Sequence, residues 1–258
     1  SWSSWGLHAG RNMDKKKICM LWGVFGLAGL LCGCTAPEPS VTAQTADTPE
    51  QAAVRWLADD AHAAFQVGDL WVTLKHTEEQ KTEISVWNPA DLSAPLQTME
   101  QEMESYAFGQ SQVVDANYDG YPDFGCLHFQ GNQPQYWNFW LWDEEQGKFV
   151  EEPALADISA PQFDAATQAV SGYARGGWAG LVGTYSFYQW EDGELVCIRR
   201  TESTVLPDET GEGERVLLTV EDRVDGALTE VVRQEYDMDS RGWLPVEEAW
   251  HDLYYHGE

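Results

Sequence analysis

From Gly68 onward, apolar and polar residues alternate over short stretches that are separated by turn-forming residues. A period of two places successive side chains on opposite faces of a strand, so each stretch predicts a half-buried β-strand. The predicted strands are Leu70–Lys75, Glu83–Trp87, Gln110–Val114, Phe124–Phe129, Tyr136–Trp142, Phe149–Glu151, Val170–Ala174, Thr184–Trp190, Leu195–Thr201, Arg215–Val220 and Leu228–Glu235. Many short strands with turn signals between them predict an all-β architecture.

Before Gly68 the apolar period is helical. Thr48-Pro49-Glu50-Gln51 has the form of a capping box with proline at the first helical position. Val54, Leu57, Ala61 and Ala64 follow at helical spacing. The pattern predicts one short N-terminal helix over residues 49 to 66.

A degenerate repeat favours one all-β arrangement over another. An aromatic residue, an acidic turn, a glycine and an apolar strand follow one another around Gly147, Gly193 and Gly242, which stand 46 and 49 residues apart. This spacing is near the period of a four-stranded propeller blade and predicts a small β-propeller of roughly four or five blades. A twisted β-sandwich is the alternative.

Residues 13 to 34 have the pattern of a lipoprotein leader. Met13, the basic run Lys15–Lys17 and the apolar run Ile18–Leu31 form a signal peptide that is too short for an ordinary transmembrane helix. The run ends in Leu31-Cys32-Gly33-Cys34, which resembles a bacterial lipobox with Cys34 as the lipidated residue. A plain signal peptide with incidental cysteines is the alternative.

These signals divide the chain and indicate its location. Residues 1–12 are interpreted as a spurious extension, 13–33 as the signal peptide, 34–48 as a flexible tether without apolar period, and 49–258 as the folded β-domain. The expected location is the cell membrane, with the domain lipid-anchored on the extracytoplasmic side.

The formal net charge of −28 limits the partners of the folded domain. Such an acidic surface repels nucleic acid and anionic membrane faces, so we expect no nucleic-acid ligand and membrane contact only through the lipid anchor. Cations and protein partners remain compatible with it.

The stretch from Asp115 to Asp123 carries the sharpest chemical signal. Oxygen-bearing side chains stand at Asp115, Asn117, Asp119 and Asp123, and Gly120 permits a sharp turn. A hard cation such as Ca²⁺ takes six to eight oxygen ligands, and the backbone carbonyl of Tyr121 supplies a further one. The spacing predicts a calcium site; an acidic hairpin turn is the alternative.

This loop also carries a resemblance. Asp115 to Asp123 followed by Phe124-Gly125 is similar to the calcium loops of FG-GAP and VCBS-type β-propeller repeats. Together with Tyr136-Trp-Asn-Phe-Trp-Leu-Trp-Asp143, Ala174-Arg-Gly-Gly177 and Tyr188-Gln-Trp-Glu-Asp-Gly193, it resembles a family of bacterial envelope lipoproteins. Some of their relatives are calcium-binding periplasmic inhibitors of lysozyme-like type IV secretion effectors. The resemblance implies Ca²⁺ held by Asp115, Asn117, Asp119, Tyr121 and Asp123.

No catalytic motif accompanies the calcium loop: the sequence has no His-Glu-x-x-His, Gly-x-Ser-x-Gly or phosphate-binding glycine loop. Trp137, Trp140 and Trp142 can form a sugar-stacking platform, although strand residues of this kind more often fill a core. Arg175, beside Gly176-Gly177, is a candidate contact for a partner, with a structural ion pair as the simpler interpretation.

We therefore expect a lipid-anchored, calcium-binding β-domain that acts by binding a protein and is not an enzyme. The partner is unknown; a secreted cell-wall hydrolase that the domain inhibits is the partner class implied by the resemblance. The alternative is a carbohydrate-active enzyme or a glycan-binding surface lipoprotein. Cys126 and Cys197 either form a disulfide or remain as unpaired thiols.

Overall fold

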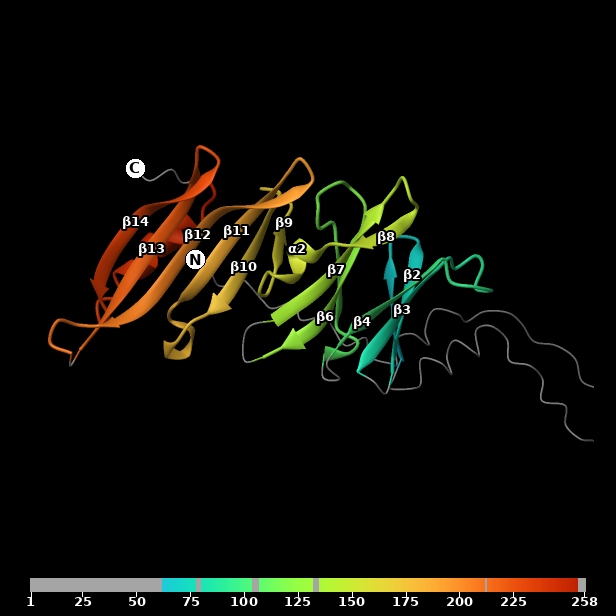
Figure 1. Ribbon diagram of the computed structural model, residues 1–258, viewed down its shortest axis with the longest axis horizontal. Helices are drawn as coiled ribbons and strands as arrows, with labels where there is room; N and C mark the ends of the chain where they lie inside the picture. Colours follow the sequence, from blue (N-terminus) through green and yellow to red (C-terminus); the bar gives the residue numbers. More distant parts are fainter. Residues whose placement is uncertain (1–61, 78–79, 104–106, 132–134, 212, 255–258) are drawn as a thin grey trace, which may run out of the picture. The chain divides into compact units, whose positions relative to one another are not determined.

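The computed structural model describes residues 62–77, 80–103, 107–131, 135–211 and 213–254. These residues form mostly antiparallel β-sheet (Figure 1). The all-β prediction is therefore confirmed. The predicted signal peptide, the tether and the expected helix up to residue 61 lie outside the described residues.

Two four-stranded sheets come first in the chain. The first has the order β1-β2-β3-β4 and the second the order β5-β6-β7-β8. Their strands are β1 (His62–Val67), β2 (Leu70–His76), β3 (Lys81–Trp87), β4 (Gln97–Glu102), β5 (Ser111–Val114), β6 (Asp123–Gln130), β7 (Gln135–Asp143) and β8 (Lys148–Glu151). Each is a meander in which consecutive strands pair.

The third sheet has six strands in the order β14-β13-β12-β11-β10-β9. A short helix, α2 (Pro153–Ala156), precedes it, and a longer helix, α3 (Trp243–Trp250), follows it. The strands are β9 (Gln162–Asp164), β10 (Ala169–Arg175), β11 (Gly183–Glu191), β12 (Glu194–Pro207), β13 (Glu214–Val224) and β14 (Ala227–Asp237), with the single turn η3 (Trp178–Gly180) between β10 and β11.

The sheets are open, so a closed propeller is not shown, and the sandwich-like alternative is compatible with them. The repeat behind the propeller prediction has a partial structural basis. Its glycines Gly147 and Gly193 lie in the turns that join β7 to β8 and β11 to β12. Gly242, however, precedes helix α3 and not a further strand, because the chain leaves the sheet after β14.

The helix predicted over 49 to 66 is wrong over its last residues, which form strand β1. A short turn at Gly68 and Asp69 returns the chain so that Val67 pairs with Leu70. Ala63, Phe65 and Val67 then enter the core with a period of two, because strand pairing with β2 overrides the helical spacing of the alanines.

The second sheet is buried on both faces. Phe124, Trp140 and Phe149 pack in one cluster with Val72 and Ile84 of the first sheet. On its other face, Phe139 packs in a second cluster with Val170 of β10 and with residues of α2. Burial on both faces explains why β6 is an almost continuous apolar run that does not alternate.

Two expectations about single residues are settled by these clusters and their neighbours. Trp137, Trp140 and Trp142 belong to the cores, as the simpler interpretation predicted, and do not form an exposed platform. Cys126 and Cys197 are unpaired thiols.

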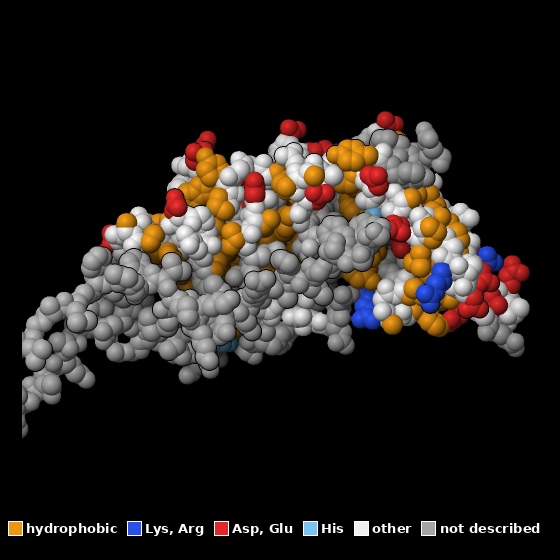
Figure 2. All heavy atoms as spheres, turned by 180° about the vertical axis from the view of Figure 1, so that it is seen from behind, with side chains coloured by type: hydrophobic (Ala, Val, Ile, Leu, Met, Phe, Trp, Pro, Cys, Tyr) orange, Lys and Arg blue, Asp and Glu red, His pale blue; other side chains and the backbone are white. Residues whose placement is uncertain are grey.

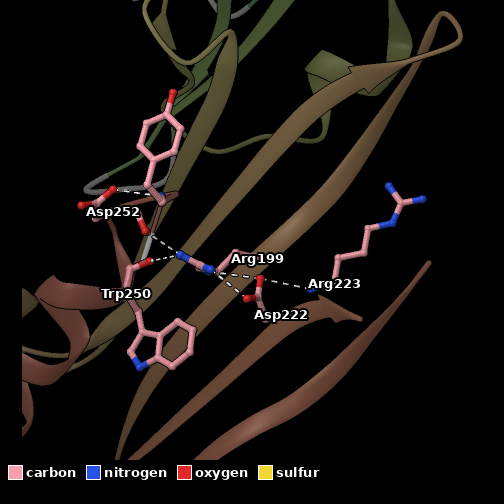
Figure 3. Close-up of polar contacts among 6 residues, drawn as sticks. Arg199, Asp222, Arg223, Trp250 and Asp252 are labelled. Carbon is pink, nitrogen blue, oxygen red and sulfur yellow. Dashed lines mark hydrogen bonds and ion pairs between the residues drawn. The ribbon is translucent and has the colours of Figure 1, made fainter. Parts of the chain in front are cut away.

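Helix α3 is fastened to the third sheet by one buried arginine (Figure 3). Arg199 of β12 forms a two-point ion pair with Asp222 of β13, through Nε at 3.2 Å and Nη2 at 2.8 Å. Its Nη1 donates to the carbonyl oxygens of Trp250 at 3.0 Å and Asp252 at 2.7 Å. The guanidinium carbon also lies 4.9 Å from the centre of the Trp250 ring.

Candidate functional site

The loop that joins β5 to β6 contains the predicted calcium ligands. Two of its residues have left-handed backbone angles, Tyr118 with φ 60° and Gly120 with φ 93°. These angles turn the chain sharply enough to bring alternate side chains to the same side of the loop.

Three of the predicted ligands are bonded to one another or to the loop backbone. The Asp115 carboxylate accepts hydrogen bonds from the amides of Asp119 at 3.0 Å and Gly120 at 2.9 Å. The Asn117 side chain donates to Asp119 Oδ2 at 2.8 Å. Asp119 Oδ1 in turn accepts from the Tyr121 amide at 2.8 Å. The structure thus brings Asp115, Asn117 and Asp119 together, as the spacing predicted.

Asp123 lies deeper than the others. It is fully buried at the start of β6, where Oδ2 accepts from the Ala116 amide and Oδ1 from the Trp142 amide, each at 2.8 Å. Burial raises its pKa to about 6; the two amide hydrogen bonds oppose the rise, and the charges of Asp119 and Asp115 add to it. Repulsion among these carboxylates is the kind of penalty that a bound cation removes.

The donor set fits a hard cation. All of the predicted ligand atoms are oxygens, and carboxylate, amide and carbonyl oxygens are the ligands that Ca²⁺ takes in proteins. As the side chains lie, no three His, Cys, Asp or Glu residues of the described ranges are gathered closely enough to hold a metal ion. The Asp123 carboxylate instead accepts hydrogen bonds from backbone amides at the start of the loop and in β7.

The calcium-type loop is attached to the third sheet at two points. The Tyr118 hydroxyl donates to the carbonyl oxygen of Ala169, at the start of β10, at 2.6 Å. Trp190 Nε1, near the end of β11, donates to the carbonyl oxygen of Ala116 at 2.9 Å. The order of the loop is therefore coupled to the two strands β10 and β11.

The same two strands carry, at their other end, a tight connection that we call the Trp178 hairpin (residues 175–182). Trp178 and Ala179 are both left-handed, with φ of 58° and 55°, and Gly180 follows with φ 87°. The turn is held by the Gly180 amide on the Gly177 carbonyl at 3.1 Å and the Leu181 amide on the Trp178 carbonyl at 3.0 Å. Two successive strained residues without glycine persist only where the surrounding structure holds them.

The tip of the hairpin exposes an aromatic and a cationic side chain. Trp178 is 52 % exposed, which is the greatest exposure of any tryptophan in the described residues. Arg175 is exposed as well, and its Nε would lie 3.0 Å from a Cβ on Gly180, so its side chain lies along the turn. Among the described residues neither Arg175 nor Arg241 forms an ion pair, whereas Arg199, Arg200, Arg215, Arg223 and Arg233 each do.

The simpler interpretation of Arg175, a structural ion pair, is therefore not what the described residues contain. Arg175 is an exposed cation on an acidic protein, and Figure 2 shows one face of the molecule with carboxylates scattered over it. The sequence did not single out Trp178. The signal was the density of glycine around it, at positions 176, 177, 180 and 183, which indicates a tightly turned backbone.

Cys34, the predicted lipidation site, lies outside the described residues, as do the signal peptide and the tether. Among the described helices, none is long and apolar enough to cross a membrane.

The chain has a distant structural neighbour among known proteins. No protein-family model matches the chain, and no curated protein matches it. A solved structure described as "Structure of a Xanthomonas Type IV Secretion System related protein" is similar over 68 % of this chain and 95 % of that chain, with a TM-score of 0.45 and 15 % sequence identity. A likeness this distant identifies neither a family nor an activity.

Proposed function

We propose that this chain is a calcium-binding, non-catalytic protein-binding domain, held by a lipid on Cys34 at the extracytoplasmic side of the cell membrane. In this proposal the partner is a secreted cell-wall hydrolase, which the domain inhibits. The proposal keeps the resemblance to envelope lipoproteins with FG-GAP-type loops. The observation that carries it is the Trp178 hairpin.

The hairpin has the properties of an anchor for a protein partner. Tryptophan and arginine are among the residues most enriched at the positions that dominate binding energy in protein interfaces. Trp178 and Arg175 are exposed on the hairpin, and the hydrogen-bonded turn holds the backbone that carries the indole. A backbone that is ordered before binding loses little conformational entropy when a partner binds, which favours affinity.

The chemistry of the tip indicates what the partner offers. A pocket for the indole must be apolar, and a carboxylate beside it would pair with the guanidinium of Arg175. The cleft of a hydrolase that uses two carboxylates on its sugar substrate combines these features. The acidic remainder of the domain favours a basic partner by long-range attraction.

In this proposal, bound calcium orders the loop that is attached to β10 and β11. Asp115, Asn117, Asp119, the Tyr121 carbonyl and Asp123 would hold the ion, which supplies charge compensation when bound. Through Tyr118 and Trp190 the ordered loop fixes the ends of β10 and β11 that lie opposite the hairpin. The ion would thus stiffen the strands that carry the hairpin.

The test uses lysozyme-type muramidases of several structural classes, acting on purified peptidoglycan with and without the full chain in mild detergent. We expect the chain to inhibit at least one class, and Trp178→Ala to weaken that inhibition by about thirtyfold, which is typical of a dominant interface residue. Trp71→Ala is the matched control, because Trp71 is 39 % exposed in the first sheet.

Two outcomes would contradict the proposal. Equal effects of Trp178→Ala and Trp71→Ala would show that the hairpin is not the anchor. Hydrolysis of peptidoglycan or another glycan by the chain itself, abolished by replacing one carboxylate, would instead favour the carbohydrate-active alternative.

A further inference from the structure

Helix α3 and the end of the Trp178 hairpin contribute to the same hydrophobic cluster. Leu181 and Val182, the last residues of the hairpin, share a hydrophobic cluster with Trp243 and Trp250 of the helix. The same cluster contains Leu218 of β13, so the hairpin, the helix and the sheet have a common core. A displacement of α3 would therefore disrupt the packing of the last hairpin residues.

The helix carries a buried acid at this contact. Glu247 is 5 % exposed, and its Oε1 has no hydrogen-bond partner among the described residues. Burial raises the pKa of Glu247 from 4.5 to about 7, and the hydroxyl of Ser203 opposes part of the rise. An ionised carboxylate in such a place is costly, whereas the neutral acid is tolerated.

Ser203 links this acid to the base of the hairpin. The Gly183 amide, at the first position of β11, donates to Ser203 Oγ at 3.1 Å, and Ser203 Oγ donates to the Gly183 carbonyl oxygen at 3.4 Å. Gly183 follows the hairpin directly. Ser203, whose hydroxyl lowers the pKa of Glu247, thus lies between this acid and the backbone of Gly183.

Two tyrosines form the second link. The Tyr173 hydroxyl donates to the carbonyl oxygen of Gly180, within the hairpin, at 3.3 Å. Its ring lies 4.6 Å from that of Tyr185, measured between centroids. Burial raises the pKa of both hydroxyls, for Tyr185 to about 12, and the nearby charge of Glu247 contributes to each rise.

Among the described residues, no cation on the packed elements neutralises Glu247. The titratable groups that respond to its charge are Tyr173 of β10 and Tyr185 of β11, and Arg175 of β10 lies near Tyr173. The other charged and titratable groups beside α3 are Arg199 of β12 with its partner Asp222 of β13, Tyr236 of β14, and His251 after the helix. Arg199 is engaged by Asp222 and by two carbonyl oxygens. Burial first, and then the charge of Arg199, lower the pKa of His251 to about 4, so that ring is neutral.

We propose that Glu247 is a proton-operated latch for the Trp178 hairpin. With Glu247 protonated, α3 stays closed on the sheet and holds the hairpin in its binding conformation. Loss of the proton places a charge in the cluster and loosens both α3 and the hairpin. This inference rests on the proposed function, because it describes the regulation of the same surface.

The direction of the pH dependence follows from the two proton affinities. The closed form holds its proton up to about pH 7, whereas an exposed glutamate loses it near 4.5. Closing is therefore coupled to proton uptake between these values, and the closed form is favoured most at the acidic end. The open fraction rises by at most about tenfold per pH unit through this window and levels off above it.

Hydrogen exchange of the free, full-length chain tests the latch without any partner. The readout is the protection of the Gly176, Gly180 and Gly183 amides, all of which donate hydrogen bonds in the closed hairpin. Glu247→Gln cannot ionise and keeps a polar side chain of the same size. Comparison of variants at one pH cancels the intrinsic pH dependence of exchange.

We expect wild type and Glu247→Gln to exchange nearly equally at about pH 4, where the closed and the open form of the wild type both hold the proton, and wild type to exchange at least about tenfold faster at about pH 8. Glu248→Gln, at the exposed neighbouring position, should behave as wild type. Equal protection of wild type and Glu247→Gln at both pH values would overturn the latch, and so would an NMR titration in which the Glu247 carboxyl ionises near 4.5. Either result would leave the binding role of Trp178 untouched, since the muramidase assay tests that separately.

Discussion

Replacement of Arg199 by methionine tests the fastening of helix α3 to the third sheet (Figure 3). The side chain of Arg199 is 4 % exposed and that of its partner Asp222 is 24 % exposed. Methionine retains much of the packing volume but removes the ion pair and the donors to the Trp250 and Asp252 carbonyls. The variant therefore isolates the polar part of the contact.

The expected loss in the free energy of unfolding is about 3 kcal/mol. Breaking a buried ion pair by removing one partner costs about 3–5 kcal/mol. The lower value applies here, because Asp222 is partly exposed and water can solvate it once Arg199 is gone. For a domain of roughly 200 residues this corresponds to a decrease in Tm of about 6–12 °C.

Arg200 on the same strand provides the control. It pairs with Glu221 at 3.3 Å, but both side chains are well exposed, at 41 % and 38 %. Exposed pairs contribute at most about 1 kcal/mol, so Arg200→Met should leave the urea unfolding midpoint nearly unchanged. A loss below about 1 kcal/mol for Arg199→Met, equal to that of Arg200→Met, would refute the assignment of Arg199 as the fastening residue.

Three further predictions concern single positions. Trp178→Gly should raise the free energy of unfolding by about 1 kcal/mol, because glycine accepts the left-handed backbone, yet should weaken inhibition by about thirtyfold, as Trp178→Ala does. Denaturant unfolding and the muramidase assay measure the two effects. Gly125→Ala should destabilise by about 1–3 kcal/mol in urea, since its Cβ would lie 2.6 Å from Phe139 Cε1, whereas Gly177→Ala, with no atom within 4 Å, should be close to neutral. The Cys126 thiol should resist alkylation until the protein is unfolded, because it is fully buried and burial raises its pKa; modification under native conditions, located by mass spectrometry, would contradict this.

The alternation of apolar and polar residues predicted the strands that bury one face and expose the other. It failed at β4, whose sequence Gln-Thr-Met-Glu-Gln-Glu has almost no apolar residues and is a strand only because β3 offers it a partner. It failed at β1 because its alanines favour a helix, whereas pairing with β2 makes the segment a strand. Helix α3 was missed because its tryptophans and Pro245 do not give a helical signal of ordinary strength.

Only one part of the candidate site could be predicted from the sequence. The calcium-type loop was visible in the sequence because its residue types and spacing define the chemistry, and the structure brings Asp115, Asn117 and Asp119 together. The exposure of Trp178 was not visible because it depends on the conformation of the turn, and the burial of Glu247 was not visible because it depends on the packing of α3 against strands far away in the chain. Local patterns cannot report such contacts.

The central claim, that the Trp178 hairpin contacts a protein, can be tested by site-specific photo-crosslinking. A photoreactive phenylalanine derivative is placed at position 178, or at position 71 as the control, in the full chain on intact cells. The account predicts a defined protein adduct from position 178 that is absent from position 71 and that is lost when Arg175→Ala is added. Adducts of equal yield from both positions, or none from position 178, would contradict it.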